Sequence, residues 1–179
     1  VPESTLLGTD PWTGKTQAEL AHEMEIPFED VLIDVIGPQG ASGAYFVMND
    51  ELQARLLQDD KVGVCSDGSP TGFHPRGHGT FARIIETYVN ERGALTLPQA
   101  VAKMTSFAAG VLSIDDRGVI AEGMLADIIV FDPAAVRETA TYPDPLQFAL
   151  GFDVVIVNGR IARENGVLAS ELNGRVLDP

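Results

Sequence analysis

The sequence predicts a mixed α/β fold, with alternating helices and strands over residues 1–115 and a smaller β part over residues 116–179. Two observations predict this division. In the first part, helix-starting signals alternate with short apolar runs, which is the pattern of βαβ units. From Gly118 onward, short runs of branched residues are separated by turns. Among these turns, Asn158-Gly159 is a strong hairpin signal, because both residues tolerate a positive φ.

Two helices are predicted near the amino end. Thr16 followed by Glu19 is a capping box, in which a hydroxyl and a carboxylate each accept a hydrogen bond from an orphan backbone amide. The helix that it opens is predicted to end near residue 25. Pro27 suits the first turn of a second helix over residues 28–36, which a Gly-Pro pair then stops.

A strand, a helix and a second strand are predicted next. Residues 44–48 form a short apolar run, and Asn49 can cap a helix over residues 50–58, whose leucines share one face. Residues 62–65 are apolar on both faces, as a parallel strand covered by helices is. This order predicts a βαβ unit.

Two further helices are predicted before the β part. Residues 81–91 have a helical pattern, and Thr96 with Gln99 forms a second capping box that opens a helix through Met104. In the β part, strands are expected at residues 119–120, 126–131, 154–157 and 160–162, with Asn165-Gly166 repeating the hairpin signal.

Composition narrows the class of partner. The chain has 12 basic and 26 acidic residues and a net charge of −14, so we expect it to repel nucleic acid and anionic membranes. No apolar run approaches the roughly 20 residues that span a bilayer, and no signal peptide is recognisable. The single cysteine, Cys65, fits a reducing compartment. We therefore expect a cytoplasmic protein, and the absence of an initiating methionine predicts a processed or partial chain.

The candidate site is the loop that follows the predicted strand at residues 62–65. It opens with Asp67-Gly68, and His74, Arg76 and His78 follow closely. A carboxylate at the carboxyl end of a buried strand is where α/β folds place chemistry. The alternative is an ordinary Asp-Gly turn, in which the carboxylate accepts backbone amides.

The other side chains of this region also have two interpretations. His74 and His78 would align on a helix as a metal-binding pair, but the proline and glycines around them predict that no helix forms there. Each histidine then fits a hydrogen-bonded loop position. Arg76 fits either a bidentate hydrogen-bonded pair with a substrate carboxylate or a structural ion pair with an acidic neighbour. Cys65, inside the apolar run, is predicted to be an inert buried thiol.

The combination of motifs resembles the amidohydrolase superfamily, and within it the N-acyl-D-amino-acid deacylase (D-aminoacylase) family. Each matching segment is common by itself, but their order along nearly the whole chain is specific. The segments are Ser66-Asp67-Gly68, His74-Pro75-Arg76 and residues 79–83, 95–100, 117–120, 123–133 and 157–159.

The resemblance implies the last part of a TIM-type (β/α)8 barrel over residues 1–115 and a small β-sandwich portion over residues 116–179. It implies that Asp67 ends the eighth barrel strand, takes a proton from a metal-bound water and passes it to the leaving amine. It also implies that Arg76 and His74 lie near the carboxylate of an N-acyl-D-amino-acid substrate. The implied cofactor is zinc.

The sequence departs from the family in its metal ligands. The family's His-x-His pair, bridging cysteine and further histidines are not found in these 179 residues, and catalytic zinc needs about three protein ligands. The resemblance therefore predicts the C-terminal part of a deacylase, inactive alone and without stably bound zinc, in which Asp67 would ligate metal only together with missing residues. The alternatives are a non-catalytic folding or association fragment, self-associating through exposed barrel edges, or part of a hydantoinase-like cyclic amidase.

Overall fold

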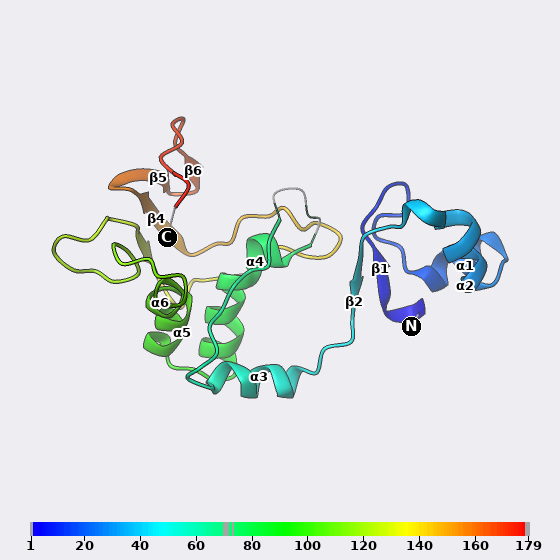
Figure 1. The fold of residues 1–179 in the computed structure, drawn as a ribbon, viewed down its shortest axis with the longest axis horizontal. Coiled ribbons are helices and arrows are strands. Elements are labelled where there is room, and N and C mark those ends of the chain that lie inside the picture. The colour runs from blue at the N-terminus through cyan, green and yellow to red at the C-terminus, as the bar shows by residue number, and fades with distance from the viewer. Residues whose placement is uncertain (1, 70–71, 73, 178–179) are drawn as a thin grey trace.

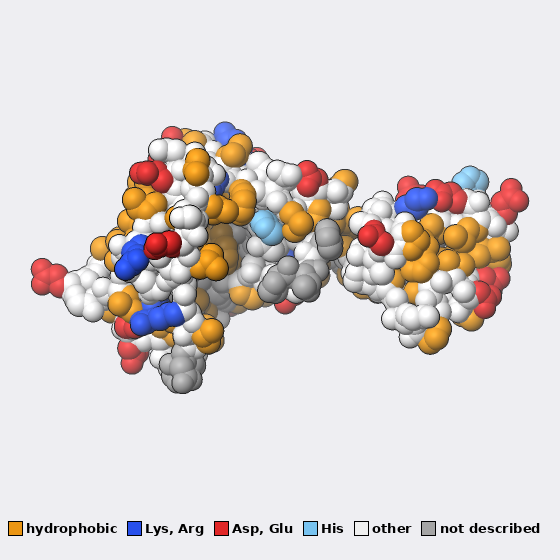
Figure 2. All heavy atoms as spheres, turned by 90° about the horizontal axis from the view of Figure 1, so that it is seen from above, with side chains coloured by type: hydrophobic (Ala, Val, Ile, Leu, Met, Phe, Trp, Pro, Cys, Tyr) orange, Lys and Arg blue, Asp and Glu red, His pale blue; other side chains and the backbone are white. Residues whose placement is uncertain are grey.

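The computed structural model describes residues 2–69, 72 and 74–177. The molecule is elongated and has two parts, which we call the N-terminal lobe (residues 2–45) and the main lobe (residues 49–177), joined by extended chain (Figure 1). Figure 2 shows the same narrow waist from above, and apolar side chains are spread over the visible face of both lobes. The fold therefore leaves much apolar surface uncovered.

The N-terminal lobe is a small antiparallel sheet with helical segments packed against it. Leu6 of one strand lies opposite Ala44 of the other. The core of the lobe consists of Leu7, Leu20, Val31 and Ile36. The elements are η1 (Pro2–Ser4), β1 (Thr5–Leu7), α1 (Gln17–Met24), α2 (Phe28–Asp30), the π-helical η2 (Val31–Ile36), η3 (Gly37–Gln39) and β2 (Gly43–Tyr45).

Both helices predicted in this lobe are confirmed, but the strand is not as predicted. The capping box opens α1, with the Thr16 N–H donating to the Glu19 carboxylate at 2.7 Å and the Glu19 N–H donating to Thr16 Oγ1 at 3.1 Å. The strand expected at residues 44–48 ends at Tyr45, which lies opposite Thr5, the first residue of β1. Its pairing is antiparallel, with a strand that the sequence analysis did not identify, so the predicted βαβ unit is wrong.

Helices make up the first half of the main lobe. Asn49 caps the first of them as predicted, accepting the Leu52 N–H at 2.9 Å, and the capping box of Thr96 and Gln99 is also confirmed. The helices enclose a core of Leu57, Ile84, Tyr88, Leu95 and Ala100. They are α3 (Asp50–Gln58), α4 (Arg76–Arg83), which continues as the π-helical η4 (Ile84–Glu91), α5 (Leu97–Met104) and α6 (Ser106–Val111).

The apolar run at residues 62–65 belongs to no sheet, so the predicted strand is wrong. In the described part of the chain no strand lies beside it, and helix α5 holds its backbone instead. The Val64 N–H donates to the Lys103 carbonyl at 3.2 Å, and Lys103 Nζ donates to the Val62 carbonyl at 2.8 Å. Cys65 is exposed, which corrects the prediction of a buried thiol. A strand needs a backbone partner and a covering layer, and neither is encoded in the run itself.

The second half of the main lobe contains an antiparallel sheet in which neighbouring strands follow one another in the chain. Both predicted Asn-Gly turns are confirmed, with φ of 50° and 76° at Asn158 and Gly159 and of 48° and 84° at Asn165 and Gly166. The strand expected at residues 119–120 does not form. The strands are β3 (Ile128–Phe131), β4 (Phe152–Val157), β5 (Arg160–Glu164) and β6 (Val167–Leu168).

The sheet joins the helices through a small shared core. Val136, fully buried in the segment between β3 and β4, packs with Ala82 and Ile85 of the α4–η4 helix. The helix that begins at Arg76 is therefore held from both sides, by α3 and α5 and by the chain that leads into β4. Among the described residues, no helix has the length and apolar character needed to cross a bilayer.

Candidate functional site

Asp67 lies at a sharp turn where the extended run ends. Its φ is +47°, a conformation that aspartate tolerates better than most residues, and its side chain is 76% exposed. The next residue, Gly68, packs against the start of helix α4. A Cβ on Gly68 would lie only 3.0 Å from the Cα of Gly77, so a larger residue would separate the loop from the helix. This close approach brings Asp67 to the first residue of α4.

That first residue, Arg76, holds Asp67 at two points. Arg76 Nε donates to the Asp67 carbonyl at 3.0 Å, and Arg76 Nη2 lies 2.8 Å from Asp67 Oδ2. Of the two interpretations of Arg76, the structure shows the ion pair, and its partner is the candidate catalytic carboxylate itself. A guanidinium carries five N–H donors, so these contacts leave donors for another group.

Helix α4 corrects the expectation that residues 74–78 are non-helical. Pro75 is compatible with a helix start, since a missing N–H costs nothing there. Gly79 is explained by packing, because a Cβ there would lie 2.5 Å from the Glu138 carboxylate. The two glycines that argue against a helix are thus positions where other chain segments, at Gly68 and Glu138, lie against the helix. Tertiary packing overrides helix propensity in this segment.

His74 lies just before the helix and is half-buried. Its Nδ1 accepts the Arg76 N–H at 3.1 Å, which assigns the proton of the neutral ring to Nε2. Burial and, secondly, the Arg76 charge lower the pKa of His74, against the opposing effect of Asp67. His74 is therefore a neutral imidazole that can donate one hydrogen bond from Nε2.

His78 does not join His74 at a metal site. It is exposed on α4, and its ring lies 5.9 Å from that of Phe148. Over residues 2–69, 72 and 74–177, no three histidine, cysteine, aspartate or glutamate side chains gather closely enough to hold a metal ion. The residues present therefore do not fit a zinc site, and Asp67 is paired with a guanidinium. His22 is exposed, as expected of a residue on the polar face of α1.

A pocket of about 340 Å³ lies beside this cluster, between the two lobes. His74 and Arg76 line it, together with Tyr142, a residue that the sequence analysis did not single out. No local signal identifies Tyr142, because its neighbours form an ordinary proline-rich turn. The remaining lining residues come from the N-terminal lobe and the candidate loop: Leu6, Leu7, Gly8, Thr13, Ser42, Gly43, Ala44 and Gly72.

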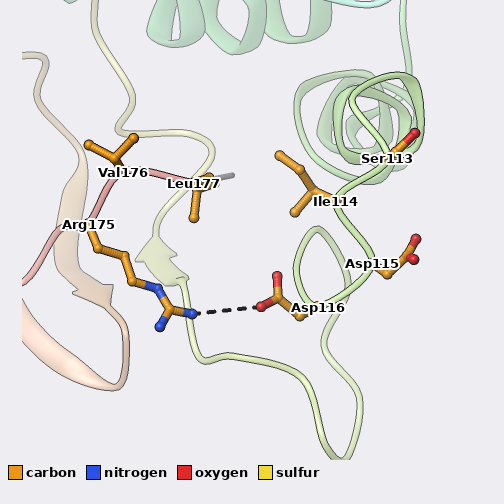
Figure 3. Close-up of a pocket in the computed structure, with 7 residues that line it drawn as sticks. All are labelled: Ser113, Ile114, Asp115, Asp116, Arg175, Val176 and Leu177. Carbon is orange, nitrogen blue, oxygen red and sulfur yellow. Dashed lines mark ion pairs between the residues drawn. The ribbon is translucent and has the colours of Figure 1, made fainter. Parts of the chain in front are cut away.

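A second pocket, of about 390 Å³, shares no lining residue with the first. It lies where the C-terminal segment passes the loop after α6, and an ion pair of 3.8 Å between Asp116 and Arg175 crosses it (Figure 3). The other lining residues are Ser113, Ile114, Asp115, Val176 and Leu177. An ion pair between two exposed side chains does not make a binding site, so we assign the second pocket no function.

The fold and this cluster define a class, which comparison with known proteins establishes. Residues 13–163 match the model of the Amidohydrolase family, and the chain belongs to that family. The relatives that it resembles are hydrolases. It is 36% identical over 169 residues to N-acyl-D-aspartate deacylase and 35% identical over 167 residues to D-aminoacylase, both from Alcaligenes xylosoxydans xylosoxydans.

Solved structures of relatives agree with the fold. The chain superposes on D-aminoacylase with a TM-score of 0.89 at 33% identity, covering 98% of this chain and 38% of that protein. It superposes on N-acyl-D-glutamate deacylase from Bordetella bronchiseptica with a TM-score of 0.84 at 31% identity, covering 93% and 37%. That deacylase was solved with zinc and a phosphonate inhibitor that mimics the tetrahedral intermediate.

The matches also show how this chain compares in length with its relatives. The match to N-acyl-D-aspartate deacylase includes 93% of this chain but only 33% of that protein. The match to D-aminoacylase includes 92% of this chain and 34% of that protein. It therefore spans about a third of the length of these relatives.

Proposed function

We propose that this chain supplies the proton-carrying carboxylate and the substrate-binding arginine of a hydrolase that cleaves the linear amide of N-acyl-D-amino acids. The observation that carries the proposal is the position of Arg76, which holds Asp67 through two contacts and also lines the adjoining pocket. The relatives named above deacylate this class of substrate, which supports the choice of reaction.

The geometry of the substrate explains why one arginine can hold both Asp67 and the carboxylate of the substrate. In an N-acyl-amino acid, only Cα separates the carboxylate from the amide nitrogen. A substrate carboxylate bound to the remaining donors of Arg76 therefore brings that nitrogen close to Asp67. Asp67 can then take a proton from the attacking water as the water oxygen bonds to the amide carbon, and pass that proton to the nitrogen as the carbon–nitrogen bond breaks, acting first as general base and then as general acid. His74, a neutral donor next to Arg76, is proposed to bind the same carboxylate.

Zinc is proposed to belong to the complete catalytic unit of the family and not to the described residues of this chain. These residues hold no group of three ligands, so we derive no step through a metal. We propose further that residues 1–115 correspond to the last part of a (β/α)8 barrel and residues 116–179 to a small β-sandwich portion. The superposition on about 38% of D-aminoacylase supports this division.

A chimera tests the proposed function. The matching third of Alcaligenes D-aminoacylase is replaced by this chain, and hydrolysis of N-acetyl-D-amino acids is followed by release of the free amine. We expect turnover that falls about 100-fold or more when Asp67→Asn is introduced, since general acid–base groups contribute about 10²–10⁴-fold. Asn also tolerates the positive φ of this position, so the backbone is preserved.

The matched control is Asp60→Asn, which removes an exposed carboxylate from the turn before the same run. It should leave turnover within about twofold of the unaltered chimera, because no proton transfer is assigned to it. Full activity of the Asp67→Asn chimera would refute the role of Asp67. Hydrolysis by the 179-residue chain alone, given only zinc, would refute the assignment of the metal site to other residues.

The alternative of a non-catalytic association fragment has one observation in its favour. The chain between the lobes exposes apolar side chains, with Val47 68% and Met48 72% exposed. Such a stretch favours self-association. Light scattering of the purified chain over a range of concentrations distinguishes the cases, and a monomer at high concentration would exclude this alternative.

A further inference from the structure

The pocket beside Arg76 is built from three distant parts of the chain. The N-terminal lobe supplies one wall through the paired strands β1 and β2, and the candidate loop supplies His74 and Arg76. The third contribution is Tyr142, from the long connection between β3 and β4, whose course toward β2 is visible in Figure 1. A residue so far along the chain reaches this pocket only because the fold holds it there.

Two sets of contacts hold Tyr142 in place. Its ring packs edge-on against His74, with ring centres 5.1 Å apart, and against Phe46, with ring centres 4.6 Å apart. Edge-to-face pairs of this kind are favourable beyond the area that they bury. Its turn is closed by the Thr141 N–H donating to the Asp144 carbonyl at 3.0 Å and by the Asp144 N–H donating to Thr141 Oγ1 at 3.2 Å. The tyrosine is therefore preorganised beside His74.

The lining of the pocket suits a carboxylate, because it contains Arg76 and leaves the partner of Arg76, Asp67, outside the lining. Arg76 is its one fully charged member, and no aspartate or glutamate is among the described residues that line it, although the chain carries a net charge of −14. Two lining residues carry neutral donors, an N–H on His74 and a hydroxyl on Tyr142. A guanidinium with neutral donors around it is suited to a single carboxylate.

We propose that Tyr142 is a substrate-binding residue that completes the carboxylate subsite formed by Arg76 and His74. Its ring fixes His74, and its hydroxyl adds a donor for the carboxylate of an N-acyl-D-amino acid. The inference rests on the proposed function for the identity of the ligand. It adds a residue to the pocket that neither the motif nor the loop around Asp67 contains.

The test compares two probes on the 179-residue chain by titration monitored in ¹⁵N-resolved NMR spectra. N-acetyl-D-alanine carries the carboxylate, and N-acetyl-D-alaninamide replaces it with a neutral group of similar shape. We expect the acid to bind about tenfold or more tightly than the amide, because a hydrogen bond to a charged group is the stronger kind. Resonances of His74, Arg76 and Tyr142 should shift on binding.

Variants then separate the ring from the hydroxyl. Tyr142→Phe keeps the ring contacts and should weaken binding of the acid about three- to tenfold while leaving the amide unchanged. Tyr142→Leu, which also removes the ring contacts, should weaken the acid more than Tyr142→Phe does. Phe148→Leu is the matched control, since Phe148 contacts His78 and does not line this pocket, and it should leave both affinities unchanged.

Several results would overturn the inference. Equal affinities for acid and amide in the unaltered chain, or no detectable binding of the acid, would remove the carboxylate subsite. Unchanged binding of the acid in both Tyr142 variants, or an equal loss in the Phe148 control, would remove the role of Tyr142. Failure of the proposed function is seen separately, as an Asp67→Asn chimera that keeps full turnover, and that result does not depend on these affinities.

Discussion

Lys103 is a buried lysine whose hydrogen bonds contribute to the stability of the main lobe. Its side chain is 6% exposed, and its ammonium donates to the Asp59 carbonyl at 2.6 Å and to the Val62 carbonyl at 2.8 Å. One buried cation therefore ties helix α5 to the turn after α3 and to the run that leads to Asp67. Lys103→Met removes the ammonium, keeps a chain of similar length and leaves both carbonyls without this donor.

The expected cost follows from opposing effects. Two hydrogen bonds to a charged group are worth about 1.5–3 kcal/mol each, so their loss costs about 3–6 kcal/mol. Burying a methionine in place of a lysine returns about 1–3 kcal/mol, because no charge is desolvated and more apolar surface is buried. Taking the middle of each range, we expect the free energy of unfolding to fall by about 2–3 kcal/mol for Lys103→Met.

Urea unfolding followed by far-ultraviolet circular dichroism measures this change. The control is Lys61→Met, which removes an exposed lysine from the same turn and should cost about 0.5 kcal/mol or less. Hydrogen exchange at the Val64 amide, bonded to the Lys103 carbonyl, should also accelerate in Lys103→Met. A midpoint equal to that of the unaltered chain, or an equal loss in the control, would refute the role assigned to the buried ammonium.

Two further predictions concern pH and the hairpin turn. Burial raises the pKa of Glu138 above its ordinary value of 4.5, against the opposing charge of Arg83, so the folded state binds this proton more tightly than the unfolded state. The contribution of Glu138 to stability is therefore largest in acid and decreases as pH rises past 4.5. Melting temperatures recorded from about pH 4 to about pH 7 should show this decrease in the unaltered chain, and Glu138→Gln should remove it. Asn158→Ala should cost about 2–4 kcal/mol in urea unfolding, because Asn158 accepts from Arg117 at 2.9 Å, donates to the Asn173 carbonyl at 2.6 Å and has a positive φ. Asn158→Gly relieves the backbone strain, and equal losses in the two variants would contradict that part of the argument.

The features that could be predicted from sequence are those whose physics is local. The capping boxes at Thr16 and Thr96 satisfy backbone amides within their own first turn, so a short pattern is enough to identify them. The turns at Asn158 and Asn165 are likewise fixed by the φ preferences of two adjacent residues. In each case the element forms where the pattern indicates.

The features that could not be predicted depend on distant contacts. The run at residues 62–65 has the composition of a strand, but its backbone bonds to a helix some forty residues away, through Lys103. Gly77 and Gly79 argue against a helix until the approaching Gly68 and Glu138 are known. In the candidate site, Asp67 and Arg76 could be identified from the motif, whereas their direct contact could not.

Trp12 and Cys65 allow the distance between the two lobes to be followed by resonance energy transfer. The chain has one tryptophan and one cysteine, and they lie in different lobes, with Trp12 packed against the N-terminal core and Cys65 exposed two residues before Asp67. A fluorescent acceptor attached to the thiol would receive excitation energy from the indole with no substitution anywhere in the chain. The efficiency of that transfer reports the separation of the lobes in solution, and adding N-acetyl-D-alanine shows whether the separation responds to a ligand between them.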